Sequence, residues 1–289
     1  MLHYSAHSVH HCLLFQTWEE ARALWERLLT LGPPHALVLM PDHVHLLTLH
    51  AGETEWRRVL YGYRAWRYQH RLRKGSPPAP GPILLPQEPP LRVADRQHLN
   101  RTTRYIHLNP CRGRLVADPL GWAFSTHRDR VGLAVPLACP LEADPYRFHG
   151  WVSADPSVDV QGTHLPNPIR DTSQATAGEI RHAVSSLLRV PVAELQRKSP
   201  ARRLAVASLK ALSRLSARAV AKAFGVAPSS VPRLTDVDSH EIALVARLLG
   251  DARFHDLKEG DLARTPSWQR YMRVIQAKRY QRFGNAFHT

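Results

Sequence analysis

The sequence predicts an α+β fold: a ferredoxin-like or RRM-like antiparallel sheet with helices, followed by an all-α helix-turn-helix domain. Two observations support this prediction. Strand and helix patterns alternate between residues 3 and 108, whereas only helical patterns follow from Ala177 onward. The chain has 289 residues, of which 44% are hydrophobic, so it is long enough for two hydrophobic cores.

The sheet domain begins with a strand predicted over residues 3–15. An amphipathic helix from Thr17 to Leu29 follows, with Thr17 as its N-cap and two glutamates in the first turn, where the helix dipole favours negative charge. The apolar run Ala36–Met40 predicts a second strand. After a tight turn, a third strand is expected from His43 to His50.

A long helix is predicted from Glu53 to Lys74, with aromatic residues spaced among arginines. One interpretation is that the aromatic rings pack on the sheet and the arginines form a solvated outer face. The other is that the arginines bind phosphates of single-stranded DNA and an exposed ring stacks on an unpaired base. The arginines expected to bind DNA in this second interpretation are Arg57, Arg58, Arg64, Arg67 and Arg71.

The segment from Gly75 to Pro90 is rich in proline, so a fourth strand near it is expected to be short or at a sheet edge. A third helix is predicted from Asp95 to Leu108, with Pro110 ending it. The predicted order is βαββαβ, with helices on one face of the sheet and an open face on the other.

His43 and His45 are the most informative residues of the sheet. Side chains on a strand alternate between faces, so the two imidazoles point the same way and can share one divalent ion. Two nitrogens do not complete a coordination sphere, so a third ligand is required. The alternative for this pair taken alone is two ordinary histidines whose nitrogens are satisfied within the protein or by water.

Tyr105 and Asn109 lie four residues apart on the predicted third helix and therefore share one face. Asn109 can supply an amide oxygen as the third metal ligand. Tyr105 would then present its phenol beside the metal, an arrangement suited to nucleophilic attack on a polarised phosphoryl group.

These motifs resemble the single-tyrosine HUH endonucleases, specifically the REP-associated tyrosine transposases of bacteria. The resemblance covers roughly residues 1–132 and rests on the segments Leu39–Leu47 and Tyr105–Arg112, on Gly113–Val116, and on Trp122, Ser125 and Arg128–Gly132. It implies that His43, His45 and Asn109 hold Mg²⁺ or Mn²⁺ and that Tyr105 is the nucleophile. Such enzymes cut single-stranded DNA and leave a 5′-phosphotyrosine and a free 3′-hydroxyl.

The chain also departs from that family. The glycine-rich turn that commonly follows the first strand is missing between Ser5 and Leu13, and Cys111 stands where a small apolar residue is usual. Arg104 and Arg112, which flank the tyrosine, are expected to bind DNA.

Composition independently favours a nucleic-acid partner. The formal net charge is +15 and the isoelectric point is near 10.4, which makes the chain a strong ligand for polyanions. No long apolar run or signal peptide is present, so no membrane association is expected and the protein is expected in the cytoplasm. Three widely spaced cysteines exclude a disulfide framework and a zinc knuckle.

Residues 134–176 are predicted to be a linker, because periodicity is lost and proline, aspartate, serine and glycine accumulate. The aromatic residues Tyr146, Phe148 and Trp151 indicate that part of this linker lies against the first domain.

Residues 177–250 are predicted to form a helical DNA-binding domain. The helices expected are Glu179–Leu188, Val192–Arg197, Pro200–Leu215, Ser216–Phe224, Pro228–Leu234 and Ser239–Gly250. No acidic residue lies between Arg197 and Thr235, and residues 177–235 resemble the duplex-binding domain of DnaA-type replication initiators. The DNA-binding residues expected here are Arg202, Arg203, Arg218, Lys222, Ser229, Ser230 and Arg233.

An alternative for this region is a bundle that docks another protein, which Pro232 in the supposed recognition helix favours. Residues 251–289 are expected to form a basic tail, with a helix at Pro266–Phe283 whose role the sequence does not indicate.

The function predicted from the sequence is a metal-dependent single-strand DNA endonuclease and strand transferase acting on hairpin or repeat DNA, as in DNA transposition. The partners expected are single-stranded or hairpin DNA at the first domain and duplex DNA at the second, bound by a monomer or homodimer. Two alternatives are a non-cleaving, sequence-specific DNA-binding regulator with the same fold and a hydrolase that uses the histidine pair on a small substrate.

Overall fold

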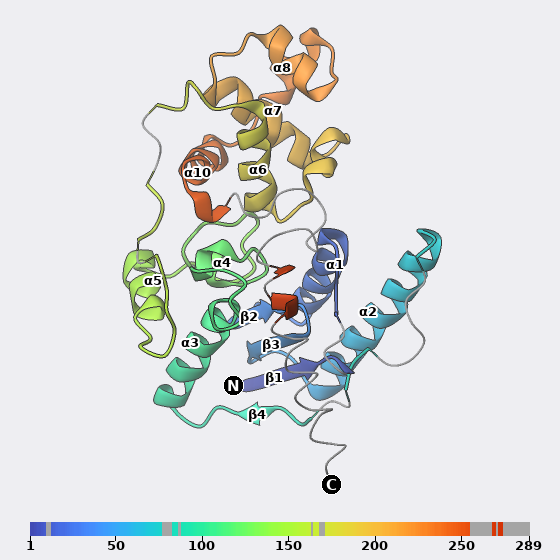
Figure 1. Ribbon diagram of the computed structural model, residues 1–289, viewed down its shortest axis with the longest axis vertical. Coiled ribbons are helices and arrows are strands. Elements are labelled where there is room, and N and C mark those ends of the chain that lie inside the picture. Colours follow the sequence, from blue (N-terminus) through green and yellow to red (C-terminus); the bar gives the residue numbers. More distant parts are fainter. Residues whose placement is uncertain are drawn as a thin grey trace.

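A computed structural model describes residues 1–9, 13–76, 83–85, 88–162, 164–167, 171–254, 268–269 and 271–273. Its amino-terminal part contains a four-stranded antiparallel sheet, and its carboxy-terminal part is helical (Figure 1). The α+β fold class expected from the sequence is therefore confirmed. Within these residues, no helix combines the length and the apolar character needed to cross a membrane.

The sheet has the order β2-β3-β1-β4, with every neighbouring pair antiparallel. The strands are β1 (Leu2–His7), β2 (Ala36–Leu39), β3 (His43–Thr48) and β4 (Leu91–Arg92). The first strand is shorter than the 3–15 expected: Ser8 and Val9 leave β1, and residues 10–12 lie outside the described part. As expected, β4 is a short edge strand; half of the residues of the proline-rich crossing before it are not described.

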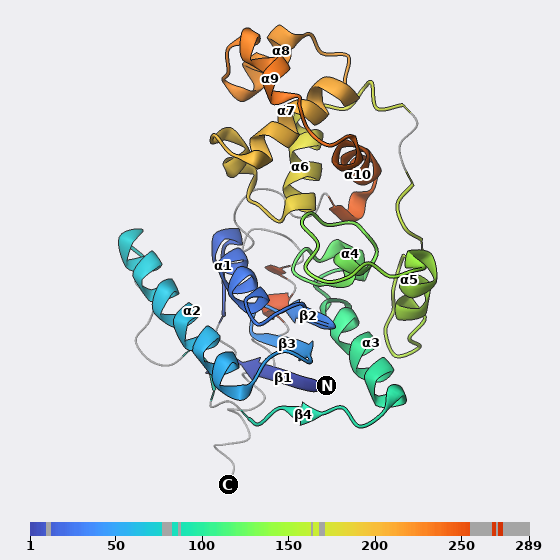
Figure 2. The same cartoon turned by 180° about the vertical axis from the view of Figure 1, so that it is seen from behind.

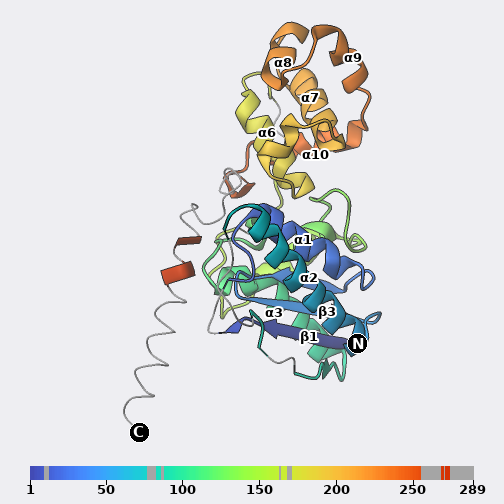
Figure 3. The same ribbon diagram turned by 90° about the vertical axis from the view of Figure 1, so that its right-hand side faces the viewer.

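Helices α1 (Trp18–Leu29) and α2 (Glu53–Arg73) pack on one face of the sheet. Their core includes Trp56, which contacts Tyr4 of β1 with ring centroids 5.3 Å apart. Helix α3 (Arg96–Arg112) lies on the opposite face, over β2 and β3 (Figure 3). The expectation of helices on one face alone is therefore wrong, because α3 partly covers the face predicted to be open.

Pro110 does not end α3, contrary to the prediction, since the helix continues to Arg112. Proline removes one backbone donor, and the surrounding packing outweighs that loss. The Pro110 side chain is buried, its carbonyl accepts from the Leu115 N–H, and Cys111 packs in a small core with Leu108 and Val152.

Residues 134–176 contain helix α5 (Pro145–Ser153), whose Val152 belongs to that small core. Phe148 contacts His107 of α3, with ring centroids 5.6 Å apart. The prediction that part of this segment lies against the first domain is confirmed (Figure 2).

The carboxy-terminal helices share a second core, which also takes in Leu120, Val131 and Leu133. The helices are α6 (Ala177–Leu188), α7 (Pro200–Leu212), α8 (Ala217–Phe224), α9 (Val231–Leu234) and α10 (Ser239–Leu249), with 3₁₀ turns at Val192–Gln196, Pro228–Ser230 and Ala252–Phe254. The predicted second helix of the helix-turn-helix, Pro228–Leu234, is divided into a 3₁₀ turn and the four-residue α9. This division follows from Pro232, which cannot donate a backbone hydrogen bond.

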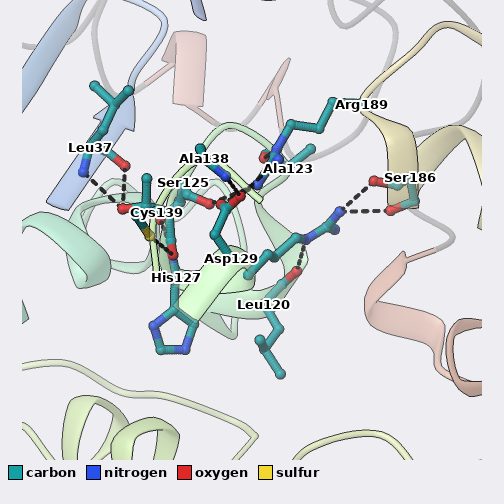
Figure 4. Close-up of polar contacts among 12 residues, drawn as sticks. Leu37, Leu120, Ala123, Ser125, His127, Asp129, Ala138, Cys139, Ser186 and Arg189 are labelled. Atoms are coloured by element: carbon teal, nitrogen blue, oxygen red, sulfur yellow. Dashed lines mark hydrogen bonds and ion pairs between the residues drawn. The ribbon is translucent and has the colours of Figure 1, made fainter. Parts of the chain in front are cut away.

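A buried polar junction joins the two parts of the chain (Figure 4). It includes the short helix α4 (His127–Arg130) and the αL residue Arg189 at the end of α6. Arg189 forms an ion pair with Asp129 and donates to the carbonyl of Ala123, 2.6 Å away. Arg128 donates to the carbonyl and hydroxyl of Ser186 in α6. These contacts fix the helical part against the sheet part.

Of the predicted tail helix Pro266–Phe283, only residues 268–269 and 271–273 are described, and they are helical. Trp268 and Tyr271 are buried against the first core, Trp268 beside Phe15 with ring centroids 5.9 Å apart. The rest of that predicted helix lies outside the described residues.

Candidate active site

Strand β3 places His43 and His45 on the face of the sheet covered by α3. Antiparallel pairing sets His43 opposite His7 and His45 opposite Ser5 on β1, whereas Val44 lies in the core on the other face. The His43 and His45 rings are edge to face, with centroids 5.1 Å apart. The sheet thus places the two imidazoles on the same face, as the sequence predicts.

Helix α3 brings Tyr105 and Asn109 to these imidazoles. Asn109 Oδ1 lies 3.0 Å from His43 Nε2, and the Tyr105 hydroxyl oxygen lies 3.5 Å from His45 Nε2. Tyr105 is 40% exposed, so its phenol faces both the imidazole and solvent. The structure therefore brings together His43, His45, Asn109 and Tyr105, the residues to which the sequence assigned metal binding and nucleophilic attack.

Asp42 orients the ring of His43. One carboxylate oxygen lies 2.7 Å from His43 Nδ1 and also accepts a hydrogen bond from the Tyr271 hydroxyl. A carboxylate only accepts, so it favours the tautomer with the proton on Nδ1 and the lone pair of Nε2 directed at α3. Tyr271 lies 229 residues away in the chain, and no local sequence signal could have placed it here.

Two further histidines belong to this cluster and were missed at the sequence level. His3 Nε2 lies 3.2 Å from His45 Nδ1, and the ring of His7 stacks on that of His43 with centroids 5.3 Å apart. Their spacing on β1 is the signal that could have found them, because alternate residues 3, 5 and 7 share a face.

Burial keeps the inner imidazole neutral. The pKa of His45 lies well below its ordinary value, chiefly because its charged form would lose hydration and also because His43, His3 and His7 would repel a second positive charge. Burial likewise lowers the pKa of His3. A neutral imidazole has a lone pair free, which is the form that binds a metal.

The donor set fits a divalent cation. With the proton of His43 on Nδ1, its Nε2 and Asn109 Oδ1 are two acceptors facing each other, unless the amide is rotated to present its NH₂ group. Two ligands in adjacent positions of an octahedral ion at about 2.1 Å lie roughly 3 Å apart, close to the distance seen here. Among the described residues, no group of three or more His, Cys, Asp or Glu side chains is placed to hold a metal ion. Asn109 Oδ1 is the further oxygen donor that lies beside the histidine pair.

Helix α2 lies on the sheet face opposite α3, the helix that carries Tyr105 (Figure 3). Arg57, Arg58 and Arg64 are exposed there. Arg67 and Arg71 are not available to DNA: Arg67 is 4% exposed, and both guanidinium groups pair with the buried carboxylate of Glu20. The prediction that these two bind phosphates is wrong, since each already neutralises an internal charge.

Arg104 and Arg112 flank the tyrosine as expected. The guanidinium of Arg112 lies 5.7 Å from the centroid of the Tyr105 ring, and that of Arg104 lies 4.7 Å from the centroid of Trp151 in α5. Arg112 also donates to Asp155. The α3 surface beside Tyr105 is therefore cationic.

The carboxy-terminal candidates divide into two groups. Arg202, Arg203, Ser230 and Arg233 line one cavity of about 610 Å³ beside the start of α7. Arg203 donates to the carbonyl of Asp236, and Arg202 to that of Phe224. The remaining three, Arg218, Lys222 and Ser229, are exposed outside the cavity lining.

Comparisons with known proteins give one distant likeness. No protein-family model and no curated protein matches this sequence. The fold is similar to a solved structure of a REP-associated tyrosine transposase bound to a REP hairpin, with a TM-score of 0.35 and 19% sequence identity. The likeness covers 50% of this chain and 86% of that one. At this TM-score it decides neither family nor function.

Proposed function

We propose that this protein is a metal-dependent single-strand DNA endonuclease and strand transferase that acts through a 5′-phosphotyrosine, as transposases of hairpin or repeat DNA do. The observation that carries the proposal is the convergence of His43 Nε2, His45 Nε2, Asn109 Oδ1 and the Tyr105 hydroxyl on the α3 side of the sheet. A nucleophile beside two imidazole nitrogens and an amide oxygen suits phosphoryl transfer better than proton abstraction or redox chemistry.

His43, His45 and Asn109 would hold Mg²⁺ or Mn²⁺. Bound there, such an ion would supply positive charge next to the scissile phosphate and to the charge that develops on its oxygens. Asp42 keeps His43 in the tautomer that can bind a metal. His3 contacts Nδ1 of His45, the ring nitrogen that does not face Tyr105. Because these side chains are packed in the sheet, the site needs little reorganisation.

In the proposed reaction, the Tyr105 oxygen forms a bond to phosphorus and the bond from phosphorus to the 3′ oxygen breaks. The phenol loses its proton and the departing 3′ oxygen gains one, so the step needs no oxidant or energy source. One phosphodiester replaces another, which lets the free 3′-hydroxyl reverse the reaction or join a different end. Arg112 lies over the Tyr105 ring and holds it by a cation–π contact.

The basic surfaces support a DNA substrate. The chain carries a net charge of +15, and the cationic groups beside Tyr105 and in the cavity near α7 are separate. We infer that the first contacts single-stranded DNA near the cut and that the second contacts a paired stem.

The test is incubation of the protein with labelled single-stranded hairpin oligonucleotides and Mn²⁺ or Mg²⁺, followed by a denaturing gel. We expect a covalent protein–DNA band that requires metal, is absent in Tyr105→Phe and persists in Tyr61→Phe, which alters an exposed tyrosine of α2. No adduct across a diverse pool, with DNA binding intact, would instead support the non-cleaving regulator.

A further inference from the structure

A second cavity lies beside Tyr105, between α3 and the segment that the sequence presents as a linker. Its volume is about 330 Å³, and it is lined by Gln97, Asn100, Arg101, Arg104 and Arg112 of α3 together with Trp151 of α5 and Asp155. Pockets of this size accept small ligands or single groups of larger ones. The lining combines cations, amides and an aromatic ring, and neither the metal ligands nor the nucleophile forms part of it.

The charge of this cavity favours an anion. Its one carboxylate, Asp155, accepts from Arg112 at 3.0 Å and from both the backbone N–H and the hydroxyl of Ser157. Arg101 and Arg104 therefore remain in excess over the acidic groups of the lining. The Nε of Arg104 is buried and has no hydrogen-bond partner among the described residues, so an acceptor from a ligand would satisfy it.

The wall opposite α3 is firmly held. Trp151 packs on Phe148 of the same helix, with ring centroids 5.8 Å apart, and its ring also meets the guanidinium of Arg104. Val152 and His149 of α5 are fully buried. An aromatic ring fixed beside two arginines is the combination by which proteins bind unpaired nucleotides.

The cavity is also next to the reacting atoms. Arg101 precedes Tyr105 by four residues, which is slightly more than one turn, or about 6 Å along the helix axis. Arg112, which lines the other end of the cavity, lies over the Tyr105 ring. If the phosphate of a DNA strand lies at the Tyr105 hydroxyl, the neighbouring nucleotide of that strand is thus long enough to enter the cavity.

We propose that this cavity binds the unpaired nucleotide adjoining the cut, with its phosphate at Arg101 and Arg104 and its base against Trp151. The proposal rests on the function proposed above, since it assumes that single-stranded DNA passes Tyr105. It assigns to α5 the role of positioning the strand, so that the phosphate is presented to the tyrosine in a fixed place.

The experiment measures binding rather than cleavage. Tyr105→Phe protein, without added metal, is titrated into a short fluorescein-labelled oligo(dT) strand and, separately, into a blunt duplex of equal length, at several salt concentrations. Arg101→Gln and Trp151→Ala are introduced into this background. Arg147→Gln is the matched control, because Arg147 is an exposed arginine of α5 outside the cavity lining.

We expect Trp151→Ala to weaken binding of the single strand about fivefold or more. Arg101→Gln should reduce the slope of log affinity against log salt by about 0.7, as loss of one phosphate contact does. Duplex binding should change little in either. The proposal would be overturned if Trp151→Ala and Arg101→Gln both bound the single strand as tightly as Arg147→Gln does. It would also be overturned if they lost as much affinity for the duplex as for the single strand.

Because the readout needs neither the nucleophile nor a metal, failure of the cavity and failure of cleavage are separate results. If Trp151→Ala perturbs the fold, Arg101→Gln still tests the cavity, because Arg101 is exposed and its replacement should not disturb packing. If protein that retains Tyr105 binds oligo(dT) normally but forms no covalent adduct, the result counts against the proposed function and not against nucleotide binding in the cavity.

Discussion

Two groups of histidines flank helix α3, and they differ in what surrounds their ring nitrogens. In the site group, His43 and His45 have their nitrogens directed at Asp42, Asn109, His3 and Tyr105. In the second group, His107, His127 and His149 are fully buried near the junction. His127 and His149 share one hydrogen bond, while both nitrogens of His107 lack partners among the described residues.

The difference teaches that histidine density alone does not mark a site. The site group has ring nitrogens that face a partly exposed tyrosine, whereas the imidazoles of the second group have no contact with solvent. His107 is two residues from Tyr105, yet it points to the opposite side of α3 and packs on His127 and Phe148. His107 is therefore not placed to exchange a proton with the Tyr105 phenol.

The largest expected effect is in the site group. His43→Ala should lower metal-dependent cleavage at least about 10³-fold, roughly 4 kcal/mol of transition-state stabilisation, because it removes a metal ligand. Rates of adduct formation measure it. His50→Ala, which alters an exposed histidine just after β3, is the control. Equal rates for the two variants would remove His43 from the site.

The junction should respond in stability instead. Asp129→Ala leaves the buried Arg189 without its carboxylate partner and should lower the free energy of unfolding by about 3–5 kcal/mol. Glu26→Ala breaks the exposed pair with Arg22 and should cost no more than about 0.5 kcal/mol. Chemical denaturation distinguishes the two. A similar small loss for both would mean that the junction contributes little.

Asp42→Asn tests whether the Asp42 carboxylate orients His43 for metal binding or only stabilises the fold. We expect Mn²⁺ affinity, measured by calorimetry, to fall about 10- to 100-fold, as when a group orienting a ligating histidine is lost. Tyr271→Phe removes the other partner of the same oxygen and should have a smaller effect. Unchanged Mn²⁺ affinity in Asp42→Asn would contradict this role.

A separate prediction concerns acid sensitivity. Burial keeps the pKa values of His107 and His127 well below the ordinary value and lowers that of His149 to about 4. These groups stay neutral in the fold but bind protons when unfolded below about pH 6.5. Stability is therefore full above that pH and falls toward pH 4, by up to about 1.4 kcal/mol per pH unit for each histidine.

His107→Leu should flatten this dependence and raise stability near neutral pH by about 1 kcal/mol, since it removes two unpartnered buried nitrogens. Unfolding free energies at about pH 7.5 and about pH 5 measure both effects. His240→Leu, at an exposed position, should leave the dependence on pH unchanged. A parent protein equally stable at both values would contradict the account of the buried group.

The sequence predicted what local periodicity determines. Alternation along β3 placed His43 with His45, and helical spacing placed Tyr105 with Asn109, so the residues that converge at the candidate site could be predicted. Contacts set by tertiary pairing could not be read in this way. Glu20 of α1 forms ion pairs with Arg67 and Arg71 of α2, and Tyr271, which is 229 residues away in the chain, donates a hydrogen bond to Asp42.

The errors have related causes. Packing around Cys111 carries α3 past Pro110, although the local rule predicts a stop there. Trp151 and Val152 stand in a segment whose composition indicates a linker, but their burial against α3 gives it a fixed place. Tertiary contacts overrode local preference at both positions.

The most direct test of the central claim is peptide mass spectrometry of the protein after reaction with a hairpin oligonucleotide and Mn²⁺. We expect a nucleotide attached through its 5′ phosphate to the peptide containing Tyr105, and an unmodified peptide containing Tyr61. An adduct on another residue, or cleaved DNA with no adduct on Tyr105, would contradict it.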